Sequence, residues 1–170
     1  MIERPKPEYR SGIGTDIHEL VPGRKLMLGG LQVPYERGLL GHSDGDVALH
    51  AVIDALLGAA GMGDIGTMFP DTDPQYKDAD SKGLLLAVKE KLEEKDWEIA
   101  NVDLIIHAQE PSLGPVKAQM KRCIASLLGI DFTAVNVKAK TNEGFGEVGA
   151  GEAIAATAIT LLKKRYRRSL

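Results

Sequence analysis

Residues 46–61 read DVALHAVIDALLGAAG, a run in which apolar side chains recur at helical spacing. This spacing predicts a helix that packs against a core. Asp46, His50 and Asp54 lie four residues apart and therefore share one stripe of the helix. Because acidic side chains are rarely buried without a partner, the stripe indicates a polar site within an otherwise apolar layer.

The segments on both sides of this helix carry their own patterns. Ser43 or Asp44 is available as its N-terminal cap. The preceding residues predict a strand from Arg10 to Leu20 and then a hairpin around Gly29-Gly30. The following residues predict a helix from Ser81 to Lys95, a strand from Ile99 to Ala108, a helix from Pro115 to Leu128, a strand from Val135 to Thr141 and a final helix from Gly151 to Lys164.

Between the first two helices, residues 62–80 are rich in Gly, Asp, Pro and Thr and predict a long ordered loop of the kind that usually carries function. The whole pattern predicts an α/β fold of the α+β sandwich type, in which a mixed β-sheet packs against helices on one face.

We expect an N-terminal extension over 1–10, a single folded domain over 11–164 and a basic C-terminal tail over 165–170. The cations near that end are interpreted as solvated and as suited to the end of a terminal helix: Lys163, Lys164, Arg165, Arg167 and Arg168.

Composition narrows the class of partner. A formal net charge of −3 and only 5% aromatic residues argue against a nucleic-acid platform. The single cysteine, Cys123, excludes an internal disulfide and lies in an apolar helical pattern, where we expect a buried thiol. No apolar run has the length of a signal sequence or a membrane span, so we expect no membrane partner. The expected location is the cytoplasm, or the plastid stroma if a transit peptide was removed.

Three residues form a candidate metal centre. Asp16 and His18 are two apart in a predicted strand, so their side chains emerge on the same face, and His50 could join them from the helix. Two imidazoles and one carboxylate suit a catalytic Zn²⁺ with an open fourth position, and iron fits nearly as well. The alternative is a surface aspartate and a hydrogen-bonded core histidine. Asp46 or Asp54, beside His50, could hold its free N–H.

The central block of the sequence carries a more specific pattern than the metal ligands alone. The residues from His42 to Ala51, Asp54 to Ala59, Gly63 to Gly66 and Phe69 to Pro74 resemble the 2-C-methyl-D-erythritol 2,4-cyclodiphosphate synthase family. Further matches follow in the same order along the chain: Asp16-Ile17-His18, Ala108-Gln109, Val137-Lys138-Ala139 and Thr141-Asn142-Glu143. The resemblance extends from about residue 11 to residue 164.

The resemblance implies a role for each matching residue. Asp16, His18 and His50 would bind one Zn²⁺ per subunit, and Glu143 would reach a Mg²⁺ or Mn²⁺ on the substrate diphosphate. His42 would stabilise the transition state together with Thr141. The residues implied for the methylerythritol phosphate end are Ser43, Asp64, Ile65, Gly66, Phe69, Pro70, Asp71, Thr72 and Asp73. Those implied for the nucleotide end are Ala108, Pro111, Ser112, Leu113, Gly114, Lys140 and Asn142.

The resemblance also implies a homotrimer about a three-fold axis, with active sites between subunits and a CDP-linked small-molecule substrate. The reaction is that of a cyclising phosphorus–oxygen lyase in the non-mevalonate route to isoprenoids. The 2-phosphate of 4-diphosphocytidyl-2-C-methyl-D-erythritol 2-phosphate attacks the β-phosphorus and CMP leaves. Two anions meet in this step, so positioning and charge neutralisation supply most of the catalysis. A nucleophilic triad is not required.

Two positions depart from the family pattern. Ser112 follows Pro111 where many members have a lysine, and Lys140 could supply a compensating charge. Glu147 and Ala150 stand where members that bind an isoprenoid diphosphate on the trimer axis have Phe and Arg. Three converging glutamates would repel a diphosphate, so we expect axial anion binding to be weak or lost.

Two other functions compete with this interpretation. A divalent-metal phosphoesterase could use the same Asp16, His18 and His50 on a different phosphate ester. A non-catalytic metal- or nucleotide-binding module is the other alternative, but it would leave the acidic loop over 62–80 without a substrate to hold. Release of CMP with a cyclic product separates the first interpretation from both alternatives.

Overall fold

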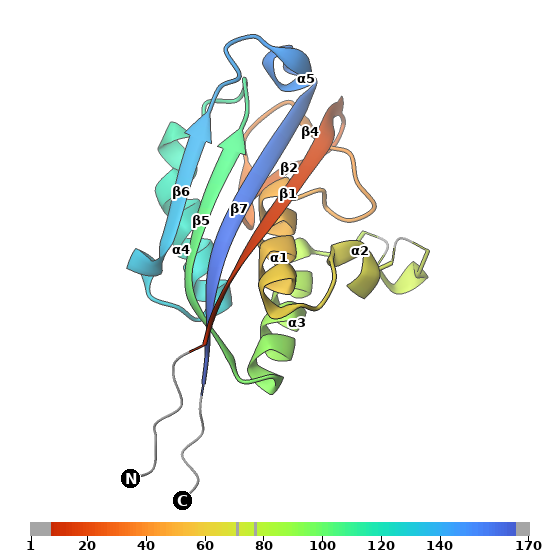
Figure 1. The fold of residues 1–170 in the computed structure, drawn as a ribbon. Helices are drawn as coiled ribbons and strands as arrows, with labels where there is room; N and C mark the ends of the chain where they lie inside the picture. The colour runs from red at the N-terminus through yellow and green to blue at the C-terminus, as the bar shows by residue number, and fades with distance from the viewer. Residues whose placement is uncertain (1–7, 71, 77, 166–170) are drawn as a thin grey trace, which may run out of the picture.

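The computed structural model describes residues 8–70, 72–76 and 78–165. Its centre is a five-stranded sheet in the order β4-β1-β7-β5-β6 (Figure 1). The strands are β1 (Tyr9–Pro22), β4 (Arg37–Leu39), β5 (Trp97–His107), β6 (Val135–Lys140) and β7 (Ala153–Lys164). β5 and β6 are parallel, whereas the β1–β4, β1–β7 and β5–β7 pairs are antiparallel. The predicted mixed sheet is confirmed.

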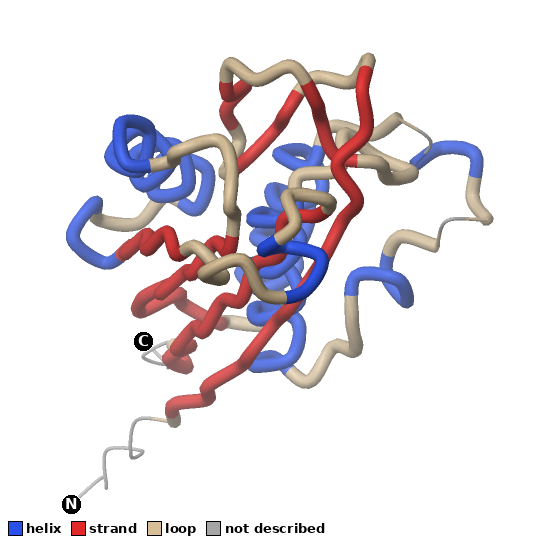
Figure 2. The backbone as a smooth tube through the Cα atoms, turned by 90° about the horizontal axis from the view of Figure 1, so that it is seen from above, coloured by secondary structure: helices blue, strands red, loops and turns tan. Residues whose placement is uncertain are grey.

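Three long helices cover one face of this sheet: α1 (Val47–Ala60), α3 (Ser81–Glu94) and α4 (Lys117–Leu128). The predicted hairpin is present as β2 (Leu26–Leu28) and β3 (Leu31–Val33), which form a separate two-stranded ribbon. The view from above shows the segment with the short α2 (Ile65–Met68) on the opposite side of α1 from α4 (Figure 2). The remaining elements are single turns: 3-10 helices at Pro74–Tyr76, Gly114–Val116 and Phe132–Ala134, and α5 (Gly146–Gly149).

β1 and α1 approach each other unusually closely. Gly12 and Gly14 are on the β1 face that meets α1, and a Cβ at either glycine would overlap a backbone carbonyl oxygen of the helix, that of Ala55 or Ala51. The alternation of side chains along a strand puts residues 16 and 18 on this same face. The glycines therefore bring the helix close enough for short side chains from both elements to meet.

The predicted final helix from Gly151 to Lys164 is wrong: these residues form β7, which pairs with β1 on one side and β5 on the other. The prediction followed the helical propensity of its Ala and Leu residues, which tertiary packing overrides here. From residue 154 to residue 162 of β7, even-numbered residues are buried and odd-numbered ones are more exposed, which is the period of a strand. Ala156 and Ala158 are among the buried residues on the helix-covered face, where α1 packs.

Several local details also differ from expectation. The cap of α1 is Asp46, whose carboxylate accepts the Leu49 amide, rather than Ser43 or Asp44. Tyr9 and Arg10, assigned to the extension, pair with β7, and residues 1–7 lie outside the described part. The segment over 62–80 contains α2 and a 3-10 turn, and β4 and α5 were not predicted.

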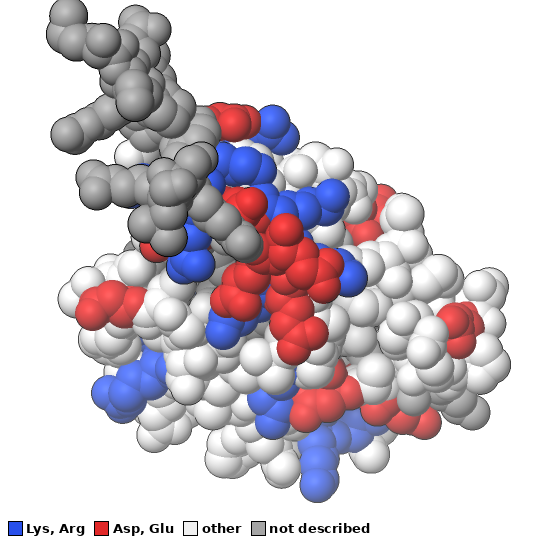
Figure 3. All heavy atoms as spheres, turned by 90° about the horizontal axis from the view of Figure 1, so that it is seen from below, with Lys and Arg blue, Asp and Glu red and all other residues white. Residues whose placement is uncertain are grey.

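Lys163 and Lys164 belong to β7 and Arg165 follows it directly, so among the described residues no terminal helix accompanies these cations. The Lys164 ammonium lies 4.4 Å from the centre of the Trp97 ring, and Arg165 faces Glu98 at 3.8 Å. Residues 166–170 of the predicted tail are outside the described residues. Acidic and basic side chains lie side by side at this end of the molecule (Figure 3).

The other face of the sheet carries no helix of the described chain, and three isoleucines are exposed on it. Ile13 and Ile17 of β1 are 64% and 56% exposed, and Ile159 of β7 is 50% exposed. The packed core lies between the helices and the sheet face that they cover. No helix among the described residues has the length and apolar character needed to cross a bilayer.

The contact between β1 and α1 can be tested at Gly14. Gly14→Val should lower the free energy of unfolding by about 1–3 kcal/mol, because the side chain must displace the helix backbone. Gly58→Ala is the matched control: its Cβ would meet only the Ile13 carbonyl oxygen, at 3.8 Å, and alanine favours the helix by up to about 1 kcal/mol. Chemical denaturation followed by circular dichroism measures both. Equal stability of the two variants would contradict a close contact at Gly14.

Candidate metal centre and substrate pockets

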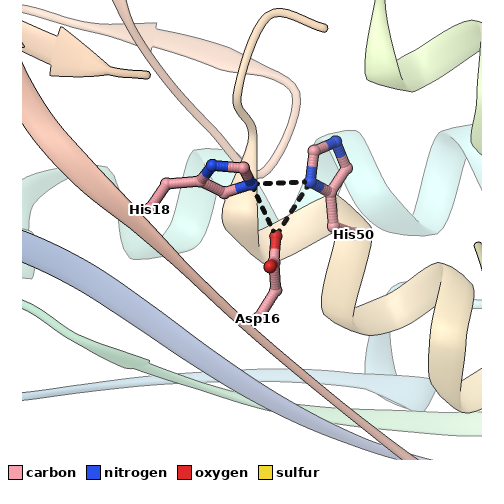
Figure 4. Close-up of side chains that lie close together, drawn as sticks. All are labelled: Asp16, His18 and His50. Atoms are coloured by element: carbon pink, nitrogen blue, oxygen red, sulfur yellow. Dashed lines mark hydrogen bonds and ion pairs between the residues drawn. The ribbon is translucent and has the colours of Figure 1, made fainter. Parts of the chain in front are cut away.

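Asp16, His18 and His50 converge on one point (Figure 4). Oδ2 of Asp16 lies 2.9 Å from Nε2 of His18 and 2.9 Å from Nδ1 of His50. The two ring nitrogens are 3.3 Å apart. The first two residues come from β1 and the third from the first turn of α1, as the sequence predicted.

The geometry fits a metal of zinc type. Ligand atoms about 2.0–2.1 Å from a tetrahedral Zn²⁺ lie about 3.3 Å from one another, close to the edges of this triangle. Three protein ligands leave the fourth position for substrate or water. The donor set of two imidazoles and one carboxylate does not itself choose between zinc and iron.

The electrostatics favour a cation at this point. Burial disfavours the Asp16 carboxylate, yet hydrogen bonds from His18 and His50 and the charge of the two rings lower its pKa to about 2. The hydrogen bond to Asp16 raises the pKa of His18, and burial opposes that rise. A bound dication would take the place of the positive charge that a protonated His18 supplies beside Asp16.

Each ring has a partner on the side away from the metal point. Nδ1 of His18 donates to the Leu40 carbonyl oxygen at 2.6 Å, which leaves Nε2 free for a metal. Nε2 of His50 contacts the Ser43 hydroxyl at 3.1 Å and the Ser81 hydroxyl at 2.9 Å. Ser81 was not singled out from the sequence. The only available sign was a serine at the start of a helix.

The prediction that Asp46 or Asp54 holds the His50 ring is wrong. The fully buried Asp46 carboxylate accepts the amides of Gly29, Gly30 and Leu49, and burial raises its pKa against these hydrogen bonds. Asp54 accepts the Ile65 amide at 2.7 Å, and burial raises its pKa as well. The spacing of four correctly grouped Asp46, the cap of α1, with Asp54 within it, but Asp46 anchors the hairpin turn and Asp54 anchors α2.

A cavity of about 210 Å³ opens beside the metal centre. The structure here brings together residues predicted from separate parts of the sequence. Its lining consists of Asp16, His18, His42, Ser43, His50, Ile65, Gly66, Phe69, Tyr76 and Leu84. His42 is exposed in the loop before α1.

The other described residues predicted for this end do not line the cavity. Asp64 caps α2 by accepting the Thr67 amide, and hydrogen bonds from the Thr67 side chain and amide lower its pKa. Asp73 accepts two hydrogen bonds from Gln75. Pro70 and Thr72 are exposed. Asp71 is outside the described residues.

A second cavity of about 200 Å³ collects most residues predicted for the nucleotide end. Its lining consists of Ala108, Gln109, Pro111, Ser112, Leu113, Gly114, Lys117, Ala139, Lys140 and Thr141. Lys117, at the start of α4, was missed, although it lies a few residues beyond Ser112 in the sequence. It supplies a second cation to the pocket, beside Lys140.

Residues 141–143 follow directly on β6. Thr141 donates its hydroxyl to the Glu143 carboxylate at 2.5 Å. Oδ1 of Asn142 lies 3.2 Å from Nδ1 of His107. Glu143 has a positive φ of 51°, so the backbone turns sharply at this acidic residue.

Comparison with known proteins gives concordant matches. The model of the YgbB family matches residues 9–163. A 2-C-methyl-D-erythritol 2,4-cyclodiphosphate synthase from Bordetella avium is 53% identical over 157 residues, 92% of this chain and 97% of that protein. The CDP complex of IspF from Plasmodium falciparum has a TM-score of 0.82 at 34% identity, covering 93% of this chain and 97% of its own. The bifunctional IspDF from Campylobacter jejuni has a TM-score of 0.91 at 42% identity; the match covers 95% of this chain but 44% of that longer one.

The charge balance of the centre predicts a pH dependence of stability. Asp16, with a lowered pKa, contributes stability above its ordinary value of 3.8 and loses it as the pH falls toward about 2. His18, with a raised pKa, contributes fully below its ordinary value of 6.5 and loses it as the pH rises through the folded-state pKa. In chelator-treated protein, Asp16→Asn should therefore destabilise most between about pH 4 and 6.5. Urea unfolding across pH measures this, with the exposed Glu90→Gln as control, and a pH-independent difference would contradict the ionic cluster.

Proposed function

Because the chain belongs to the YgbB family, we propose that it catalyses the reaction for which its relatives are named. It closes 4-diphosphocytidyl-2-C-methyl-D-erythritol 2-phosphate to the 2,4-cyclodiphosphate and releases CMP, as a phosphorus–oxygen lyase of the cytoplasm. The observation that carries the proposal is the convergence of Asp16, His18 and His50 at a pocket lined by the loop before α1 and by α2.

The chain's own residues account for binding and orientation. Asp16, His18 and His50 would hold a divalent ion, which would supply positive charge for the phosphate oxygens that carry negative charge in the reaction. His42, exposed at the rim of the same pocket, is placed to donate a ring N–H to a phosphate oxygen. Asp54 fixes the Ile65 amide and so holds α2, with Gly66, against the pocket. We assign the methylerythritol phosphate end of the substrate to this pocket.

The nucleotide end is assigned to the second cavity. Lys117 and Lys140 offer two cations there for the CDP phosphates, in the absence of a lysine at Ser112. Thr141 lies at the same cavity, and its hydroxyl orients the Glu143 carboxylate, which we propose as the ligand of Mg²⁺ or Mn²⁺. Carboxylate oxygens are the ligands that Mg²⁺ prefers.

Within one chain the two cavities are too far apart for one diphosphate. The triad rises from β1 and Thr141 follows β6, and three strand steps separate them in the sheet. At about 4.8 Å per step this is about 14 Å. A site that contains both cavities therefore needs a second copy of the chain, whose nucleotide cavity would face the metal centre of the first copy. This supports the homotrimer with active sites between subunits.

The uncovered face of the sheet supports the same assembly. Ile13, Ile17 and Ile159 form an exposed apolar surface of the kind that marks association. Next to Ile17, a cavity is lined by Glu19, Glu147 and Glu152, with Arg37 as its cation. Three copies of this acidic lining about an axis would bind an isoprenoid diphosphate weakly, and we retain that expectation.

Turnover by purified protein tests the proposed reaction. With the CDP-linked substrate, Zn²⁺ and Mg²⁺, chromatography should detect CMP and the cyclic diphosphate in equal amounts.

His50→Ala should lose most bound zinc and reduce turnover at least about 100-fold, because only two ligands remain. His107→Ala, on β5, should keep its zinc. Release of inorganic phosphate without CMP would indicate a phosphoesterase instead, and zinc binding without turnover would indicate a binding module.

Association through the sheet face is tested at Ile159. Ile159→Lys should shift the chain from trimer to monomer in sedimentation equilibrium, because a charge would be buried in an apolar contact. Leu86→Lys, a similarly exposed leucine on α3, should leave the trimer intact. A monomeric native protein, or a trimeric Ile159→Lys variant, would contradict this interface.

A further inference from the structure

Behind His50, on the side away from the metal point, lies a hydroxyl–carboxylate pair that the proposed reaction does not use. Ser81 is the fully buried first residue of α3, and its Oγ is 2.9 Å from Nε2 of His50. Ser81 Oγ also donates to Oδ1 of Asp44 at 2.5 Å, and its backbone amide donates to Oδ2 of the same carboxylate. Asp44, Ser81 and His50 thus form a continuous hydrogen-bonded chain.

The direction of these hydrogen bonds follows from the donors that each group possesses. An ionised carboxylate only accepts, so the single hydroxyl proton of Ser81 points to Asp44. Ser81 Oγ can then only accept from the imidazole, and Nε2 of His50 must carry a proton. The lone pair that a metal requires is thereby left on Nδ1, the nitrogen that faces Asp16 and His18.

Ser43 cannot impose this choice by itself. Its hydroxyl is 3.1 Å from the same Nε2 and accepts the Gly45 amide at 3.2 Å. No carboxylate of the described residues takes its proton, so the hydroxyl can rotate and either donate to the ring or accept from it. The Asp44 carboxylate is what distinguishes Ser81.

We propose that Asp44 and Ser81 are positioning residues for the metal centre: the carboxylate fixes the serine proton, and the serine oxygen fixes the His50 tautomer with Nδ1 toward the metal. The inference rests on the proposed metal site. It assigns to a hydroxyl backed by a carboxylate the task that the Leu40 carbonyl performs for His18. Partners of this kind typically change metal affinity about 10–100-fold.

The same pair connects the metal centre to the segment that precedes α3. The Asp44 amide donates to the Ala79 carbonyl oxygen, and the Asp78 amide donates to that of His42. The loop that carries His42 and Ser43 is therefore tied to the N-terminus of α3 through both backbone and side chain. Orientation of the His50 ring depends on this connection being intact.

Zinc affinity measured by chelator competition tests the inference. Ser81→Ala should raise the zinc Kd about 10–100-fold, and Asp44→Ala should raise it similarly although Ser81 is still present. The double variant should be no weaker than either single variant, because the two residues act as one unit. Turnover of Ser81→Ala should recover largely at saturating zinc. Ser81→Thr, which retains the hydroxyl, should restore most of the affinity.

Thr160→Val is the matched control. Thr160 is also fully buried, and its hydroxyl donates to the Asn101 carbonyl oxygen, on the sheet away from the metal centre. Its loss should lower stability without changing zinc affinity. If wild-type protein binds zinc and turns over but Ser81→Ala binds zinc equally well, or if the Ser81 and Asp44 effects simply add, this inference fails while the proposed function stands. Wild-type protein that binds no zinc would overturn both.

Discussion

At Gly12 and Gly14 no side chain separates β1 from α1, so the backbones of a strand and a helix pack directly against each other. Two residues further along the same strand face, Asp16 reaches into the space that this approach creates, and His18 follows it. Short side chains can meet His50 only because the helix lies so near. Every distance in the metal centre depends on this contact, since any larger residue at either glycine would move the helix away from the strand.

The centre is arranged to hold a cation at one point. The Asp16 carboxylate at that point has a pKa lowered to about 2, and each ring has a fixed partner on the side away from the metal point. Those partners come from different elements, a carbonyl of the segment after β4 for His18 and the first residue of α3 for His50. Preorganisation of this kind lets binding energy act on the substrate instead of on ordering the ligands.

The sequence predicted the candidate metal triad, the first helix and the mixed sheet. Asp16 and His18 follow from a spacing of two along a strand and the helix from its own periodicity, whereas His50 was joined to them through the family resemblance. Prediction failed where non-local packing decides. The Ala-rich segment over 151–164 has the composition of a helix, and only its place between β1 and β5 makes it a strand. Asp46 lies one turn from His50, as expected, but the nearby hairpin amides take its carboxylate. Ser81 is thirty-one positions from His50 in the sequence, and no spacing rule connects them.

The position of β7 also constrains the order in which this protein can form. β1 is the first strand to be synthesised, yet its longest pairing is with the strand that leaves the ribosome after all the others. Until then no strand connects β1 to β5, and the metal centre has no complete sheet beneath it. Such distant pairing is slow and leaves apolar edges exposed on the nascent chain. The helices and the β5–β6 pair can assemble early, but completion of the fold awaits one late insertion into the middle of the sheet.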